Sequence, residues 1–120
     1  MIENFGIGID IVDITRFKKI PFNENKKFYE KIFLPSEIKY CLKFKKSYER
    51  FAGKFAIKES VQKAISHKIS LNKIETFHKK SIPQVRINSK KENYSFLVSL
   101  SHDKEVAVAV VVAEKNIDIL

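Results

Sequence analysis

The sequence is poor in several residue types that mark particular protein classes. Its 120 residues include no tryptophan, one cysteine, three glycines and three prolines. The single cysteine, Cys41, excludes an internal disulfide and is typical of a reducing compartment. No apolar run approaches the roughly 20 residues of a membrane-spanning helix, and the start of the chain lacks the basic and apolar segments of a signal peptide. We therefore expect a cytoplasmic protein without a membrane partner.

Arginine is also scarce, whereas lysine is abundant. Arg16, Arg50 and Arg86 are the three arginines among 23 basic residues, and 14 acidic residues leave a net charge of +9. This excess predicts an acidic partner, such as nucleic acid, an anionic surface, an acidic protein or a polyphosphate ligand. Because proteins that read nucleic acids favour arginine forks, the lysine-rich composition counts against the first of these partners.

The order of helix and strand patterns predicts one α+β domain, residues 1–120, in which an antiparallel sheet packs against helices. Residues 5–12 indicate a buried strand, and a long helix at about 48–66 occupies the middle of the chain. Residues 106–112 are apolar on both faces, which is typical of a central strand. The other expected elements are a short helix to Lys19 capped by Asp13 or Thr15, a helix at 25–33, a helix at 36–45 capped by Ser36, and strands at 73–79, 83–88, 94–101 and 105–113.

Asp10 interrupts an otherwise apolar strand, where a carboxylate is costly unless a cation, a metal or strong hydrogen bonds stabilise it. It shares a strand face with Gly6 and Gly8, whose missing side chains leave room for a ligand or for another backbone. The opposite face carries Ile7, Ile9 and Ile11. Two interpretations stay open: an aspartate bonded to backbone amides or to a lysine, and a Mg²⁺ ligand that faces the gap over the glycines.

Glu59 is a second acid in an unexpected place, because it lies on the long helix beside small apolar residues. Lys63 follows four residues later on the same helix face, and an ordinary exposed pair of this kind contributes only a few tenths of a kcal/mol. The helix also carries a polar stripe, which consists of Lys54, Lys58 and Gln62. Since Mg²⁺ is often held by one or two carboxylates together with water and substrate phosphates, Glu59 and Asp10 are candidate ligands of one magnesium ion.

Ser99, Ser101 and His102 end a strand at a turn. These residues suit either simple turn chemistry or a contact to a phosphate or nucleotide. A Ser–His–Asp hydrolase is a poor match, because Ser101, His102 and Asp103 are consecutive whereas a triad is assembled from separated positions. The three histidines lack the spacing of a metal site, and no glycine-rich phosphate loop of a known kind is present.

Three blocks of the sequence span nearly the whole chain: residues 6–12 followed by Arg16, residues 51–64, and residues 98–103 followed by an alternating Ala/Val strand that ends in Glu114. The middle block is the most specific. In this order the blocks resemble those of the holo-[acyl-carrier-protein] synthases, the small 4′-phosphopantetheinyl transferases of bacterial fatty acid synthesis. The resemblance implies the transferase fold and one enzymatic activity.

By resemblance, the enzyme transfers the phosphopantetheine arm of coenzyme A to a serine of an acidic apo acyl carrier protein, and adenosine 3′,5′-bisphosphate is the other product. The resemblance also implies a homotrimer with active sites between subunits, Mg²⁺ bound by Asp10 and Glu59, and Lys63 as the residue that stabilises or protonates the leaving phosphate. The serine proton would pass to Glu59 or to a metal-bound water, and Arg16 would dock the carrier protein. The implied coenzyme A contacts are Lys54, Lys63, Ser101 and His102.

The sequence departs from the family pattern at two places: Ser60 replaces the usual alanine, and Ser81-Ile82 stands in place of a Gly-Lys pair in a turn that contributes to the coenzyme pocket. One alternative is a basic module that binds RNA or DNA, which accounts for the charge but not for Asp10 and Glu59, since both would repel phosphates without a metal. A second alternative is a catalytically silent relative that only binds carrier protein. The intact acid pair and Lys63 argue against it.

Overall fold

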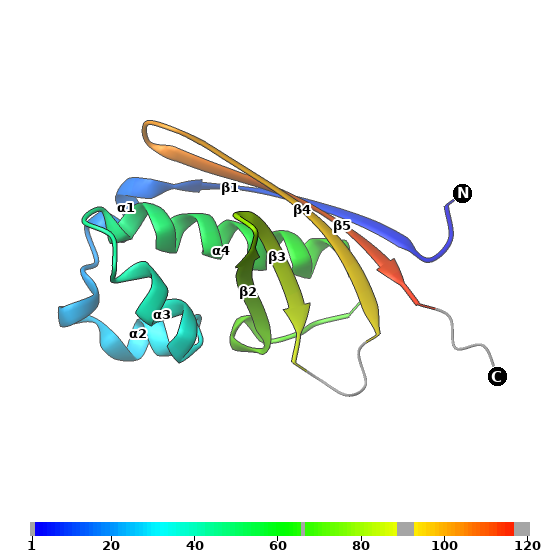
Figure 1. Cartoon of the computed structure of the whole chain (residues 1–120), viewed down its shortest axis with the longest axis horizontal. Helices are drawn as coiled ribbons and strands as arrows, with labels where there is room; N and C mark the ends of the chain where they lie inside the picture. The colour runs from blue at the N-terminus through cyan, green and yellow to red at the C-terminus, as the bar shows by residue number, and fades with distance from the viewer. Residues whose placement is uncertain (1, 66, 89–92, 117–120) are drawn as a thin grey trace.

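The computed structural model describes residues 2–65, 67–88 and 93–116 of the chain. A long helix lies along one face of a twisted sheet, and the shorter helices gather at one end of the molecule (Figure 1). This arrangement confirms the predicted α+β fold. None of the helices in the described part of the chain combines the length and the hydrophobicity that crossing a membrane requires. The elements in chain order are β1 (Phe5–Asp13), α1 (Ile14–Lys18), η1 (Phe22–Glu24), α2 (Lys26–Glu30), α3 (Pro35–Cys41), α4 (Ser47–Ala64), η2 (Leu71–Lys73), β2 (Ile74–Lys79), β3 (Ile82–Ile87), β4 (Tyr94–Asp103) and β5 (Val106–Lys115).

The main sheet has the strand order β1-β5-β4, and both pairs are antiparallel. The apolar strand β5 is therefore central, as predicted. Its partner β1 comes from the other end of the chain, with Phe5 opposite Glu114 and Asp10 opposite Ala109. Strands β2 and β3 form a separate antiparallel hairpin, which lies across α4 in Figure 1.

Helix α4 packs against β1 at backbone contact distance. A Cβ atom added to Gly8 would lie 1.9 Å from the carbonyl oxygen of Ser60, and one added to Gly6 would lie 1.7 Å from that of Ala64. The room that the missing glycine side chains leave is thus filled by the backbone of α4. Ser60, which departs from the family pattern, donates its hydroxyl to the carbonyl of Ala109 at 3.0 Å and to a carbonyl of its own helix. This contact ties the helix to β5 at the residue that pairs with Asp10 of β1.

The outer face of the main sheet is apolar and exposed, so the prediction of a fully buried first strand is wrong for one of its faces. Ile7, Ile9 and Ile11 are 69%, 58% and 66% exposed, because the helices cover only the opposite face. Leu97 on β4 is exposed as well. The outer sheet face consists of the apolar Ile7, Ile9, Ile11, Leu97 and the partly buried Val108, Val110 and Val112, together with the exposed Ser99 and Ser101 of β4.

The predicted polar stripe of α4 lies largely inside the protein, because Lys54 and Lys58 are buried. Lys58 donates to the carboxylate of Glu37 at 2.6 Å and to the carbonyls of Ile32 and Leu71 at 2.8 and 3.0 Å. All three ammonium protons therefore have acceptors, which is the condition for burying such a charge. Lys54 donates to the Thr76 hydroxyl at 2.9 Å. The acid that makes this burial possible comes from α3, 21 residues earlier in the chain.

The short helices follow the predicted order, and one of their predicted caps is confirmed while another is wrong. Asp13 caps α1 by accepting from the backbone N–H of Thr15 at 3.0 Å, so Asp13 is the cap and Thr15 is not. At α3 the cap is the Glu37 carboxylate, which accepts from the N–H of Leu34 at 2.7 Å, and the predicted Ser36 cap is wrong. Helices α2 and α3 are both shorter than predicted. Packed aromatic rings join these helices to α4; they belong to Phe17, Tyr29, Phe33 and Phe51.

The turn between β2 and β3 adopts a backbone conformation that glycine favours, although it contains no glycine. Lys80 and Ser81 have φ angles of 52° and 67°, the left-handed region that two-residue hairpin turns require. The departure from the family pattern at Ser81-Ile82 therefore keeps a hairpin turn but places strained residues in it.

Candidate active site

Asp10 and Lys63 form the centre of the candidate site. The Lys63 ammonium lies 3.1 Å from Asp10 Oδ1 and donates to the carbonyl of Ile9 at 2.9 Å. Of the two interpretations of Asp10, the lysine contact is thus present, although 53 residues separate the partners. The Asp10 side chain is 16% exposed and that of Lys63 is 55% exposed, so the pair lies at the surface edge between β1 and α4.

Glu59 completes the site from the preceding turn of α4. Its carboxyl is partly buried, and no described residue donates a hydrogen bond to it. Burial and the nearby Asp10 carboxylate raise the pKa of Glu59, whereas the positive charges of Lys63 and Arg16 lower it. Arg16 on α1 also places its guanidinium 5.2 Å from the centre of the Phe55 ring. Two carboxylates and two cations from three elements therefore share this edge of the molecule.

The carboxylate pair suits a magnesium ion better than a metal that needs a full set of protein ligands. Among residues 2–65, 67–88 and 93–116 there is no group of three or more histidine, cysteine, aspartate or glutamate side chains that could hold a metal. Zinc sites use three or four such ligands, whereas Mg²⁺ takes one or two carboxylates and completes its shell with water and phosphate oxygens. The raised pKa of Glu59 beside Asp10 fits a place where a cation belongs between the two acids.

Lys54 and His102 lie in a different place, around a cavity of about 140 Å³ between α4 and strands β2, β3 and β4. The Lys54 ammonium lies 4.8 Å from the centre of the Tyr40 ring, and burial lowers its pKa. The His78 ring stacks on the same Tyr40 ring, with 5.1 Å between the two ring centres. Burial, together with the charges of Lys54 and Arg50, lowers the pKa of His78. The cavity thus combines cationic and aromatic groups, as an anionic ring-bearing ligand would require.

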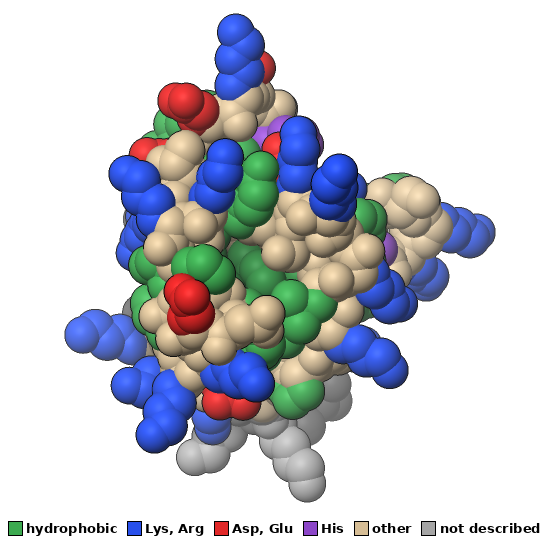
Figure 2. Space-filling model, turned by 90° about the vertical axis from the view of Figure 1, so that its left-hand side faces the viewer, with side chains coloured by type: hydrophobic (Ala, Val, Ile, Leu, Met, Phe, Trp, Pro, Cys, Tyr) green, Lys and Arg blue, Asp and Glu red, His purple; other side chains and the backbone are tan. Residues whose placement is uncertain are grey.

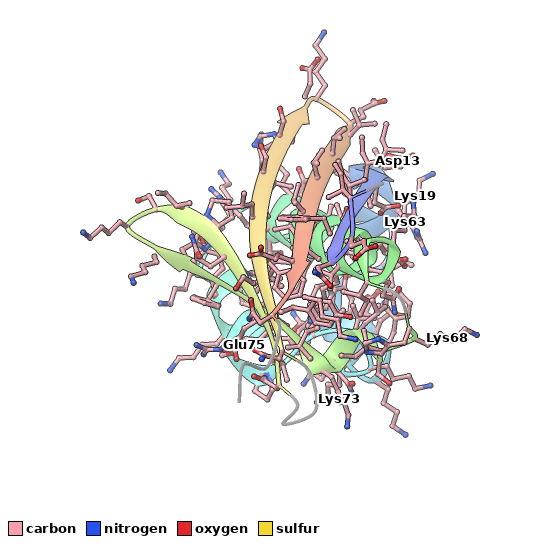
Figure 3. The ribbon with its side chains drawn as sticks, turned by 90° about the vertical axis from the view of Figure 1, so that its right-hand side faces the viewer. Asp13, Lys19, Lys63, Lys68, Lys73 and Glu75 are labelled. Carbon is pink, nitrogen blue, oxygen red and sulfur yellow. The ribbon has the colours of Figure 1, made fainter. Side chains whose placement is uncertain are left out.

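The two sets of residues lie on opposite sides of α4. Five residues separate Lys54 from Glu59, which corresponds to a rotation of about 140° around the helix axis. Figure 3 shows Lys63 on the same side as Asp13 and Lys19, whereas Glu75 of β2 lies on the other side of the main sheet strands. One chain therefore does not bring Lys54 and His102 to the acid pair.

Ser101 occupies a third position. It lies opposite Val108 in the register of β4 and β5, on the outer sheet face, and it is exposed. Its neighbour His102 points to the inner side and lines the cavity. The hydroxyl and the imidazole that the sequence placed together thus face opposite sides of the sheet, because successive side chains of a strand alternate.

Sequence reasoning missed several residues of the cavity and of the buried network. Glu37 and Thr76 hold the two buried lysines, and Arg50, Tyr40 and His78 line the cavity. Glu37 lies in a segment that the sequence marked only as a helix start, where an acid is unremarkable. No motif or spacing in the sequence distinguishes the other four residues, Thr76, Arg50, Tyr40 and His78.

Comparisons with known proteins agree on one family. The family model described as 4′-phosphopantetheinyl transferase superfamily matches residues 6–111. The holo-[acyl-carrier-protein] synthase of Geobacter sulfurreducens is 35% identical over 92% of this chain and 98% of its own length, and that of Caldicellulosiruptor bescii is 38% identical over the same shares.

Solved structures give the same result. The Helicobacter pylori holo-[acyl-carrier-protein] synthase in complex with coenzyme A superposes with a TM-score of 0.76 at 35% identity, covering 90% of this chain and 99% of that one. The Bacillus anthracis synthase, in complex with CoA (3′,5′-ADP), has a TM-score of 0.76 at 32% identity and covers 92% and 96%. Sequence, fold and family model together place this chain in the 4′-phosphopantetheinyl transferase superfamily, among the holo-[acyl-carrier-protein] synthases.

Proposed function

We propose that this protein transfers 4′-phosphopantetheine from coenzyme A to a serine of an apo acyl carrier protein, in the cytoplasm and for fatty acid biosynthesis. The relatives named holo-[acyl-carrier-protein] synthase support this activity, since they match over nearly their whole length. The observation that carries the proposal is the cluster of Asp10, Glu59 and Lys63 at the junction of β1 and α4. Paired acids beside a lysine are the groups that phosphoryl transfer uses to position charge.

In the proposed reaction, the serine oxygen of the carrier protein bonds to the phosphorus that bears the pantetheine arm. The bond from that phosphorus to the bridging oxygen breaks, and both electrons leave with adenosine 3′,5′-bisphosphate. Asp10 and Glu59 would hold Mg²⁺, which when bound neutralises charge on the diphosphate. Lys63 stabilises the phosphate that leaves. The serine proton would pass to Glu59 or to a metal-bound water.

The coenzyme contacts require a second subunit. Lys54 and His102 lie on the far side of α4 from the acid pair, and Ser101 lies on the outer sheet face. We assign the cavity of Lys54 and His102 to the nucleotide of coenzyme A, with Lys63 at the diphosphate of the neighbouring subunit. A homotrimer that buries the outer sheet face would bring these half-sites together, and the exposed Ile7, Ile9 and Ile11 supply the apolar surface such an assembly needs.

The carrier protein would dock at the end of the molecule that holds α1, α2 and α3. Figure 2 shows this end, where lysine and arginine side chains project around hydrophobic atoms in a shallow hollow. Arg16 lies on α1 and interacts with Glu59 electrostatically, so a carrier docked there is close to the acid pair. An acidic partner fits the net charge of +9.

Mass spectrometry tests the proposal directly. An apo acyl carrier protein is incubated with this protein, coenzyme A and Mg²⁺, and a parallel sample contains EDTA. We expect a mass gain of one phosphopantetheine group per carrier in the first sample and none in the second. A carrier that stays unmodified in both samples, with folded protein and several different carriers, contradicts the proposed activity.

A further inference from the structure

Lys63 is bonded to Asp10, although Glu59 is its neighbour one helical turn away. Its ammonium contacts Asp10 Oδ1 at 3.1 Å and the carbonyl of Ile9 at 2.9 Å. Glu59 accepts no hydrogen bond from the described residues. The lysine therefore spans from α4 to β1 and leaves one of the two acids without a bonded cation.

The close packing of helix and strand explains this choice. Backbone contact at Gly6 and Gly8 brings α4 directly onto β1, so the Lys63 side chain reaches the strand carbonyl and the carboxylate together. The Lys63 side chain is nevertheless 55% exposed. Its contacts are therefore made at the surface, where a side chain exchanges partners without any rearrangement of the core.

An ammonium group and a divalent cation at the same carboxylate oppose each other. Asp10 Oδ1 offers its electrons to Lys63 in this structure, and Mg²⁺ needs carboxylate oxygens as ligands. The two positive charges, held within a few ångströms, also repel each other through the space between them. A repulsion of this kind at a partly exposed site lowers the affinity for a divalent ion by about tenfold.

We propose that Lys63 competes with the divalent cation for Asp10, and that the diphosphate of the coenzyme relieves this competition by drawing Lys63 to its own oxygens. This inference rests on the proposed function and adds to it a mode of control: the cation is retained firmly only when a diphosphate is present. Each ligand then raises the affinity for the other by the same factor, because linkage is reciprocal.

The first test measures Mn²⁺, a spectroscopic substitute for Mg²⁺, by electron paramagnetic resonance without coenzyme. Removal of the competing charge in Lys63→Met is expected to tighten Mn²⁺ binding by about tenfold, whereas Lys63→Arg keeps the charge and should stay near the wild-type affinity. Lys73→Met is the matched control, because Lys73 is exposed on η2 and lies far from Lys63 in Figure 3. Equal or weaker Mn²⁺ binding by Lys63→Met overturns the proposal.

The second test repeats the titration with saturating coenzyme A. In the wild type, coenzyme A should tighten Mn²⁺ binding strongly, and in Lys63→Met this gain should shrink, because the competitor is already gone. An unchanged gain contradicts the proposal even if the first test succeeds. Failure here is distinct from failure of the proposed function, since a wild-type protein that modifies apo carrier protein but shows no Lys63 effect on Mn²⁺ refutes only the competition.

Discussion

The ammonium group of Lys58 lies 2.6 Å from the carboxylate of Glu37, and neither side chain is exposed. The second oxygen of this carboxylate accepts the N–H of Thr76 at 2.8 Å and also its hydroxyl. Through the Glu37 carboxylate, Lys58 is linked to α3 and, by way of Thr76, to β2. Lys58 directly precedes Glu59 on α4. The pair fixes the rotation of the helix that carries the proposed metal ligand.

Replacement of Lys58 by methionine should destabilise the protein by about 3–5 kcal/mol, because Glu37 is left as a buried charge without its partner. The double variant Lys58→Met/Glu37→Gln should lose less than the sum of the two single variants. Urea denaturation measures these free energies. Lys39→Met, at an exposed position of α3, is the control and should stay within about 0.5 kcal/mol of the wild type.

Gly8→Ala should damage both stability and metal binding. The new Cβ would lie 1.9 Å from the Ser60 carbonyl, so α4 must move away from β1 and Glu59 must move away from Asp10. We expect a loss of at least about 2 kcal/mol in the free energy of unfolding and weaker Mn²⁺ binding. Thermal unfolding and paramagnetic resonance measure the two effects.

The matched control for this variant is Gly53→Ala on the same chain. The three atoms nearest to its Cβ would all belong to the Leu100 side chain, with Cδ2 at 3.1 Å, and the end of a leucine side chain can shift. Alanine also favours a helix interior by up to about 1 kcal/mol. Gly53→Ala should therefore stay close to wild type in both measurements. If both glycine variants behave alike, the helix–strand contact does not set the geometry of the acid pair.

Glu59→Gln should stabilise the fold at neutral pH while it removes the proposed activity. Burial and Asp10 raise the pKa of Glu59 above its ordinary value of 4.5. Between pH 4.5 and the folded-state pKa, the folded protein therefore holds the Glu59 proton more tightly than the unfolded chain does. The contribution of Glu59 to stability therefore falls as pH rises from 4.5 through the folded-state pKa, and glutamine abolishes that fall. The gain should stay below about 1 kcal/mol, because solvent screens a partly exposed group.

Chemical denaturation at a series of pH values checks this prediction. The variant and the wild type should be equally stable at a pH well below 4.5 and should diverge in favour of the variant as the pH approaches 7. A variant that is less stable than the wild type at neutral pH would show that Glu59 is held by favourable contacts in its charged form.

Two inactive variants should restore activity when their subunits are mixed. Glu59→Gln removes the acid half-site, and His102→Ala removes part of the cavity on the other side of α4. If a neighbour completes each site, mixed assemblies contain some sites in which both residues are intact, and turnover should return to a measurable fraction of the wild-type rate. Ile9→Glu on the outer sheet face should give monomers in sedimentation analysis and no activity, whereas Ile82→Glu at the equally exposed hairpin tip should stay assembled in the same sedimentation analysis.

Much of this molecule could be predicted from the sequence, because its signals are local. Asp10 stood out as an acid between isoleucines, and Glu59 with Lys63 stood out through helical spacing. The apolar pattern at 106–112 identified the central strand, and Gly6 and Gly8 indicated that another backbone packs closely against the first strand. Each of these inferences needs only a residue and its neighbours within one or two turns.

The errors concern partners that come from distant parts of the chain. Lys58 was assigned to a polar stripe without a partner, because nothing near it in the sequence shows that Glu37 will pack against it. The sequence could not show that Lys63 bonds to Asp10 rather than to Glu59. Ile9 was assigned to a buried strand, because the sequence shows that the residue is apolar but not whether other residues of the same chain cover it.

The pairing of β1 with β5 also decides when the site can form during synthesis. The strand that carries Asp10 is made first, yet its hydrogen-bonding partner occupies residues 106–115. In the nascent chain, β1 therefore stays unpaired until residues 106–115 have been translated, whereas the helix α4 can form earlier. Folding of the sheet is consequently a late event that follows release of β5 from the ribosome, and the isoleucines of β1 lack their sheet neighbours in that interval.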